Sequence, residues 1–152
     1  MSTISTLFDT IKSAATATLS SHYVLSNPYN PEENDELSLN QGVGVAFGSG
    51  QKSDREIDNH LWIRRSFSIV VTRRFFATEL NTSDKETTEK DLFEDQKLLI
   101  IKMMQDPLVG ISNSVAKLIF ISDNGIETIF GEADNFLKLV SNFEVEYRET
   151  IF

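Results

Sequence analysis

Residues 61–77, with the sequence LWIRRSFSIVVTRRFFA, predict the fold more clearly than any other stretch. Apolar and polar side chains alternate along it, as in a strand with one buried and one solvent-facing side. The stretch is far longer than a typical strand of about 5–6 residues, so we expect it to bend or to project as the arm of a hairpin. The predicted buried parity holds Leu61, Ile63, Phe67, Ile69, Val71 and Phe75, interrupted by Arg65 and Arg73.

Helices are predicted on both sides of this strand. Residues 3–20 carry apolar side chains at helical spacing, which predicts an amphipathic helix packed on the core. A second helix is predicted to begin at Ser83, which forms a capping box with Glu86, and to end before Pro107. Its predicted buried face consists of Leu92, Phe93, Leu99, Ile100, Met103 and Met104.

Further strands are predicted before and after the second helix. Residues 42–48 read as a short strand whose glycines indicate a bulge or a close backbone approach. Residues 115–121 and 126–130 flank an Asn-Gly pair, which is typical of a tight hairpin turn. Residues 137–148 alternate again and predict a last long strand.

Together these elements predict a single α+β domain over residues 1–152. We expect a mainly antiparallel sheet of long strands with two helices packed on one face, in the order α-β-β-α-β-β-β. The connection around residues 26–60 is predicted to be an extended acidic loop, because residues 26–38 contain two prolines and residues 49–59 are polar. Its clustered acids are Glu32, Glu33, Asp35 and Glu36.

The composition excludes several classes of protein. With 40% hydrophobic residues and eleven phenylalanines, the chain can form a real core. It has no cysteine, which excludes disulfides and thiolate metal sites. A net charge of −9 argues against a surface that holds nucleic acid. No apolar run is long enough to span a membrane and the start lacks a secretory signal, so we expect synthesis in a cytoplasm.

The sequence offers little for catalysis. Its two histidines, His22 and His60, fall in predicted loops or strand edges, and no nucleophile elbow accompanies them. The spacing of Gly42, Gly44 and Gly48 does not fit a dinucleotide-binding loop. We therefore expect a binding protein that is not an enzyme and that uses no cofactor or metal.

Charge is segregated along the chain. Residues 61–77 contain Arg64, Arg65, Arg73 and Arg74 and no acid, a net +4, whereas residues 79–95 set seven acids against two lysines, a net −5. One explanation is pairing of the strand with the adjoining helix within the chain. The other is pairing between neighbouring copies in a ring, where arginine forks bind carboxylates. In that case Trp62, Phe75 and Phe76 suit the centre of the interface.

These two explanations differ in what charge reversal does. If the arginines serve an interface, Arg64→Glu combined with Arg73→Glu leaves the single chain folded and blocks ring formation. If they pair internally, the double variant unfolds.

The layout resembles the tail terminator (tail-completion) proteins of long-tailed bacteriophages. The resemblance spans nearly the whole chain and consists of an N-terminal amphipathic helix, the long strand LWIRRSFSIVV at residues 61–71, a capped helix, a hairpin and a closing strand that ends FEVEYR at residues 143–148. It carries no catalytic motif. The acidic segment 26–60 is long for that family.

The resemblance implies a structural role in the virion, at the head-proximal end of the tail. Such proteins form a ring, typically a hexamer, which caps the finished tail tube, stops its elongation and offers its other face to the head-completion (connector) protein. The DNA only passes through a negatively charged channel. By analogy, Glu32, Glu33, Asp35 and Glu36, or Glu86 and Glu89, would line that channel.

Two other functions remain open from the sequence. The chain fits a head-tail connector or a tail-tube subunit, whose rings stack without a stop. It also fits a small acidic adaptor or inhibitor, which would stay monomeric and bind one basic partner with strong salt dependence.

Overall fold

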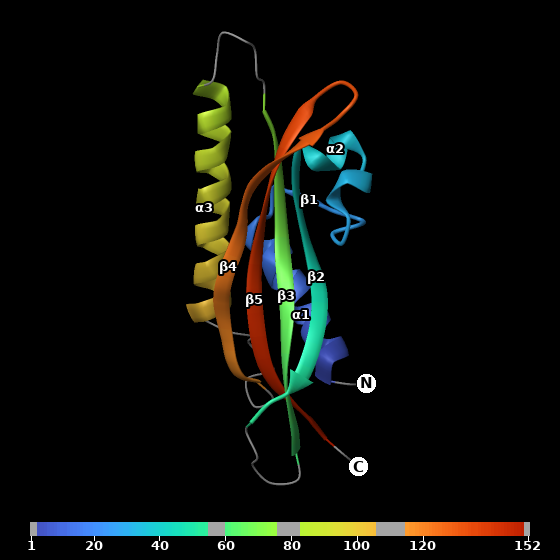
Figure 1. The fold of residues 1–152 in the computed structure, drawn as a ribbon, viewed down its shortest axis with the longest axis vertical. Coiled ribbons are helices and arrows are strands. Elements are labelled where there is room, and N and C mark those ends of the chain that lie inside the picture. Colours follow the sequence, from blue (N-terminus) through green and yellow to red (C-terminus); the bar gives the residue numbers. More distant parts are fainter. Residues whose placement is uncertain (1–2, 55–59, 76–82, 106–114, 151–152) are drawn as a thin grey trace.

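The computed structural model describes residues 3–54, 60–75, 83–105 and 115–150. They form a five-stranded sheet in the order β1-β2-β3-β5-β4, with helices α1 and α3 on one face (Figure 1). The short β1 pairs in parallel with β2, and every other pairing is antiparallel. The elements are α1 Thr3–Thr18, β1 Tyr23–Val24, a 3-10 turn Pro31–Glu33, α2 Glu36–Leu39, β2 Gln41–Lys52, β3 His60–Phe75, α3 Ser83–Gln105, β4 Val115–Phe130 and β5 Asn135–Thr150.

This architecture confirms the predicted α+β fold with long antiparallel strands. The alternation along β3 also has the predicted consequence, because Phe67, Ile69 and Val71 are buried against the two helices. Arg65 and Arg73 share their parity and therefore point to the same face of the sheet.

A row of four phenylalanines crosses the sheet, one on each of the four long strands, at paired positions of the register. Phe47, Phe67, Phe143 and Phe120 stand opposite one another on β2, β3, β5 and β4. Their ring centroids are 5.4, 5.2 and 5.6 Å apart in that order, and Phe8 of α1 lies 4.9 Å from Phe47. Such pairs contribute about 0.5–1.5 kcal/mol each beyond the burial of their surface.

The other face of the sheet is covered at one end only. There the segment between α1 and β2 packs Leu25 and Leu39 against Val70, Ile129 and Phe136 in a second apolar cluster. In Figure 1 this segment, with α2, lies on the opposite side of the sheet from α3. The far end of this face carries the buried Trp62 of β3 together with polar side chains such as Arg64 and Glu146.

The prediction of an exposed loop over residues 26–38 holds in part: most of these side chains are exposed, but the segment contains a 3-10 turn and the start of α2, and Pro31 and Asn34 are buried. The segment folds around the buried Asn34, whose side chain accepts hydrogen bonds from Ser26 Oγ and Asn27 N and donates to the carbonyl oxygens of Asn27 and Pro31. One asparagine thus satisfies several backbone groups that a loop would leave to water. Its apolar residues are then free to cover the sheet.

Two glycines of β2 explain how this segment comes so close. A Cβ atom at Gly44 would lie 2.7 Å from Cβ of Pro28, and one at Gly42 would lie 2.6 Å from the carbonyl oxygen of Ser38. The predicted close backbone approach is confirmed here, and β2 also has a bulge between Phe47 and Gly50. The strand continues to Lys52, so the predicted loop 49–59 begins too early. Residues 55–59 lie outside the described part.

The predicted hairpin at Asn124 and Gly125 is wrong. β4 runs without a turn from Val115 to Phe130 and pairs with β5 on both sides of this point. Gly125, with φ of 76°, lies in a bulge where its N–H donates to Asp123 Oδ1. A left-handed glycine fits a bulge as well as a turn, and continuous pairing with β5 decides between them. The hairpin turn follows β4 instead, at residues 131–134.

Candidate interaction surfaces

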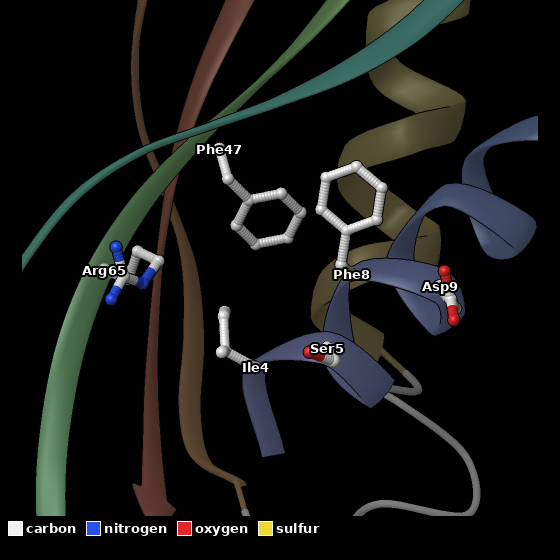
Figure 2. Close-up of a pocket in the computed structure, with 6 residues that line it drawn as sticks. All are labelled: Ile4, Ser5, Phe8, Asp9, Phe47 and Arg65. Atoms are coloured by element: carbon white, nitrogen blue, oxygen red, sulfur yellow. The ribbon is translucent and has the colours of Figure 1, made fainter. Parts of the chain in front are cut away.

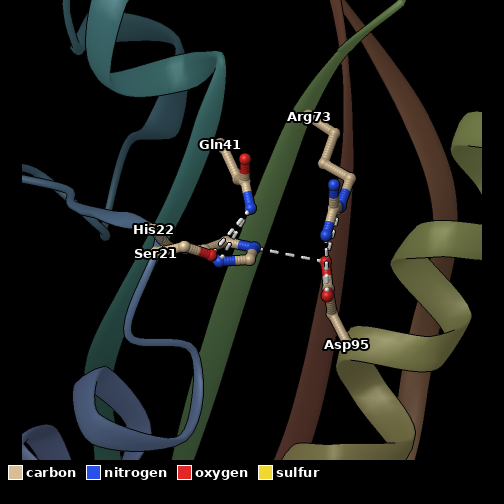
Figure 3. Close-up of polar contacts among 5 residues, drawn as sticks. All are labelled: Ser21, His22, Gln41, Arg73 and Asp95. Carbon is tan, nitrogen blue, oxygen red and sulfur yellow. Dashed lines mark hydrogen bonds and ion pairs between the residues drawn. The ribbon is translucent and has the colours of Figure 1, made fainter.

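A buried polar network joins the end of α1 to β2, β3 and α3 (Figure 3). Asp95 of α3 accepts hydrogen bonds from Arg73 of β3, at 2.7 Å from Nε and 2.9 Å from Nη2. His22 Nε2 lies 3.3 Å from the same carboxylate, and Gln41 Nε2 lies 3.4 Å from His22 Nδ1. Gln41 also donates to Ser21 Oγ at 3.1 Å. The carboxylate of Asp95 therefore joins α3 to β3 and to His22 after α1, and Gln41 of β2 joins the network through that histidine.

Electrostatics keeps Asp95 ionised. Burial raises the pKa of Asp95, but hydrogen bonds from His22 and Arg73 and the charge of Arg73 outweigh it, so the pKa lies below its usual 3.8. The hydrogen bond to Asp95 likewise raises the pKa of Arg73. The internal explanation of the arginine pattern thus applies to Arg73, and reversing its charge would set two carboxylates against each other inside the chain.

The other arginines of β3 have different surroundings. Arg74 lies 3.4 Å from Asp134, at the turn before β5. Arg65 donates to Tyr147 Oη at 3.1 Å and to the carbonyl oxygen of Gly48 at 3.0 Å. Arg64 is half-exposed on the second sheet face, opposite Glu146 of β5, and its Nε is shielded from solvent without a hydrogen-bond acceptor among the described residues.

Two of the three aromatic residues predicted for an interface, Trp62 and Phe75, are buried within the folded chain. Phe75 belongs to the main core, and Trp62 is also buried. An interface gains energy from surface newly removed from water, so neither side chain suits that role in the folded chain, and this part of the prediction is corrected. Phe76 lies outside the described residues.

The predicted channel acids of the loop are held within the chain. Glu32 binds Lys138 at 3.0 Å, and its pKa is lowered by a backbone hydrogen bond and by Lys138. Asp35 caps α2, and hydrogen bonds from Ser38 lower its pKa. The remaining contacts are Glu33 with Asn27 Nδ2 and Glu36 with the backbone N–H groups of Glu132 and Ala133. These acids stabilise the covering segment.

The two groups of predicted channel acids do not meet in one chain. Glu86 is exposed and Glu89 half-buried near the start of α3, on the helical face of the sheet. The segment that carries Glu32 and its neighbours lies with α2 on the other face (Figure 1), where Glu32 binds Lys138 of β5. A single channel lining made of both groups would need several copies of the chain.

An apolar groove lies between α1 and the edge of the sheet (Figure 2). Ile4, Phe8 and Phe47 line it, and Figure 2 shows the two phenylalanine rings side by side. The groove is open to solvent and has a volume of about 460 Å³. Polar groups border it at Ser5, Asp9 and Arg65. We call this feature the α1–β2 groove.

The side of α3 that faces away from the sheet is apolar as well. Phe93 and Met104, predicted to be buried, are 48% and 46% exposed, and Ile101 is 38% exposed. The prediction is wrong because the sheet covers only the strip that holds Leu92, Leu99 and Met103. We call Phe93, Ile101 and Met104 the α3 ridge.

Helical geometry places Phe93 and Met104 of this ridge on the β4 side of α3 and Ile101 on the side directly away from the sheet. Gln96 reaches across to Asp123 of β4, whereas Asp95 points toward β3. At 100° per residue, Phe93 and Met104 lie beyond Gln96 on the side away from Asp95. The ridge and the α1–β2 groove therefore flank opposite edges of the sheet.

Both edges of the sheet are open over much of their length. Within the described residues, no strand pairs with the outer side of β4, and β1 covers β2 only at Gly42 and Val43. Register shifts interrupt β4 at three places, which limits indiscriminate pairing with other strands. Open edges of this kind are surfaces that another chain can meet.

No protein-family model matches this sequence, and no curated protein matches it. In the described part of the chain, no group of three or more His, Cys, Asp or Glu side chains is arranged to hold a metal ion. No described helix combines the length and apolar character that a membrane crossing requires. The surfaces above are therefore the features on which a function can be based.

The sequence contained weak signals for some of these surfaces. The sequence shows that Phe93 and Met104 are apolar, but no local pattern indicates that the sheet is too narrow to cover them. The pairing of His22 with Asp95 spans distant segments, so no local pattern indicates it. The groove depends on how α1 crosses β2, which is decided by packing.

Proposed function

We propose that this chain is a structural subunit of a phage tail, which forms a ring on the completed tail tube and stops its elongation. The observation that carries the proposal is the sheet with two open edges, each flanked by an exposed apolar surface. A chain with different surfaces on opposite edges makes head-to-tail contacts, and such contacts close into rings when the rotation between copies fits.

The layers of the molecule support the same role. The helices cover one face of the sheet, while the second face is half covered and half polar. A ring of such subunits presents two unlike ends, one to the tube and one to the head-completion protein. Addition stops because the outer end does not repeat the surface on which the ring was seated.

Repeated weak contacts are enough for a stable cap. Each subunit contributes one contact to the tube and two to its neighbours, and contacts that act together give an avidity far above that of a single one. This agrees with an acidic chain of net charge −9 whose central opening would repel the DNA backbone and let it pass.

The test is to add the purified protein to tail tubes during growth and measure tube lengths in electron micrographs. We expect shorter tubes that carry a ring at one end and no longer grow when more tube protein is supplied. Tubes that lengthen by incorporating the protein would identify a tube subunit instead. Tubes that neither bind it nor change would contradict the proposal, and a single salt-sensitive partner would favour the adaptor.

A further inference from the structure

We infer that neighbouring copies dock with the α3 ridge of one copy seated in the α1–β2 groove of the next. The inference rests on the proposed ring and names the surfaces that build it. The occupant of the groove is therefore a second copy of this chain.

The two surfaces match in shape and polarity. The ridge is a convex row of exposed apolar side chains, Phe93, Ile101 and Met104. The groove is concave and its floor is apolar, with Phe8 and Phe47 in contact (Figure 2). Aromatic and methionine side chains are enriched at the centres of protein interfaces. Seating the ridge in the groove removes both from water.

Charge at the borders of the two surfaces is complementary. Lys97 is exposed and, by helical geometry, lies among the ridge residues, between Phe93 and Ile101. Asp9 is exposed at the border of the groove, where Figure 2 places it beside Phe8. Opposite charges at the rim of an interface favour one orientation over others.

The strand directions allow this arrangement without turning a copy over. β2, β3, β5 and β4 alternate in direction across the sheet, so β4 is antiparallel to β2. A neighbour placed beside β4 in the same orientation therefore presents an antiparallel β2. The bulges of β4 keep the strands from pairing continuously, so the ridge and the groove carry the specificity.

Cysteine cross-linking tests the contact directly, because the chain contains no cysteine of its own. Two variants are made, Asp9→Cys and Lys97→Cys, and each is first shown to fold by circular dichroism. They are then mixed and oxidised under conditions in which the wild type forms rings. We expect a disulfide between one copy of each variant and little linkage within either variant alone.

The matched control replaces Lys97→Cys by Leu37→Cys, at an exposed apolar residue of α2 away from both surfaces. Mixed with Asp9→Cys, it should give no specific disulfide. Charge exchange gives a second readout: Lys97→Asp should weaken ring formation about three- to tenfold, and adding Asp9→Lys in the same chain should restore it.

The outcomes separate this inference from the proposed function. Linkage of Lys97→Cys to itself would mean a symmetric contact through the ridge and would overturn the inference. Rings that form while the mixed disulfide stays absent would overturn it too, yet leave the ring-forming function intact. If the wild-type protein never forms rings, on tubes or alone, both the proposed function and this contact are overturned.

Discussion

The long strand β3 carries the same Arg-Arg pair twice, and the two pairs serve different purposes. At one end, Arg73 binds the buried Asp95 at 2.7 Å and Arg74 lies 3.4 Å from Asp134. At the other end, Arg65 bonds to a tyrosine hydroxyl and a backbone carbonyl, and Arg64 remains half-exposed on an uncovered part of the sheet.

The difference shows that the surroundings, and not the motif, decide what an arginine does. Near Arg73 and Arg74 the sheet is covered on both faces, by α3 and by the segment that ends in α2. There the positive charges balance acids of the same chain. Near Arg64 no described helix covers the second face; there Arg64 stands opposite Glu146 of β5 and remains half-exposed.

The largest effect is expected from Asp95→Ala, which removes the carboxylate that Arg73 and His22 share. Breaking a largely buried ion pair leaves a charge without compensation, so we expect a loss of about 3 kcal/mol in the free energy of unfolding. Urea unfolding followed by circular dichroism measures it. The control is Glu94→Ala at the exposed neighbour, with a change within about 0.5 kcal/mol. If Asp95→Ala and Glu94→Ala lower the free energy of unfolding equally, Arg73 is not held by a buried ion pair in the way that distinguishes it from Arg64.

A smaller loss of stability is expected when the pH is lowered. The folded pKa of Asp95 is depressed below 3.8, so its contribution is present above that value and is lost as the pH falls through the folded pKa. In this window the wild type should lose up to about 1.4 kcal/mol per pH unit more than Asp95→Asn. Unfolding curves between pH 5 and pH 2.5, taken on both proteins, provide the check. If the wild type and Asp95→Asn lose the same stability as the pH falls, the pKa of Asp95 is the same in the folded and the unfolded chain.

Asp134→Ala should have a still smaller effect. Its ion pair with Arg74 is partly exposed, and such pairs contribute at most about 1 kcal/mol. The same urea measurement applies, and Arg74 then keeps its backbone bond to Asn40. A loss as large as that of Asp95→Ala would show that this end of β3 is held together by both arginines equally.

The smallest change in stability is expected at Arg64. Arg64→Gln, which places no second carboxylate beside Glu146, should alter the free energy of unfolding by less than about 0.5 kcal/mol, because the side chain is half-exposed and its Nε makes no described hydrogen bond. If this end of the sheet meets a partner, the variant should nevertheless cap tail tubes less well. Tube lengths in micrographs test this, with Lys12→Gln on the exposed side of α1 as the control. Normal capping would remove Arg64 from the interface.

Much of the fold followed from local patterns, and the errors have a common cause. The long strand β3 and the two long helices were predictable because their periodicity extends over many residues. The Asn-Gly pair was misread because a bulge and a turn need the same backbone conformation at Gly125. The burial of Asn34 within the mostly exposed segment 26–38 was not predicted, because composition does not reveal burial.

The sequence by itself determined the class of the fold and its long alternating strands. These are properties of neighbouring residues, and a period of two or of 3.6 makes them visible. Only the tertiary structure decided which arginines are neutralised, which apolar residues of α3 stay exposed and where the groove lies. Each of these depends on which distant segments come together, because a side chain is buried only when another part of the chain covers it.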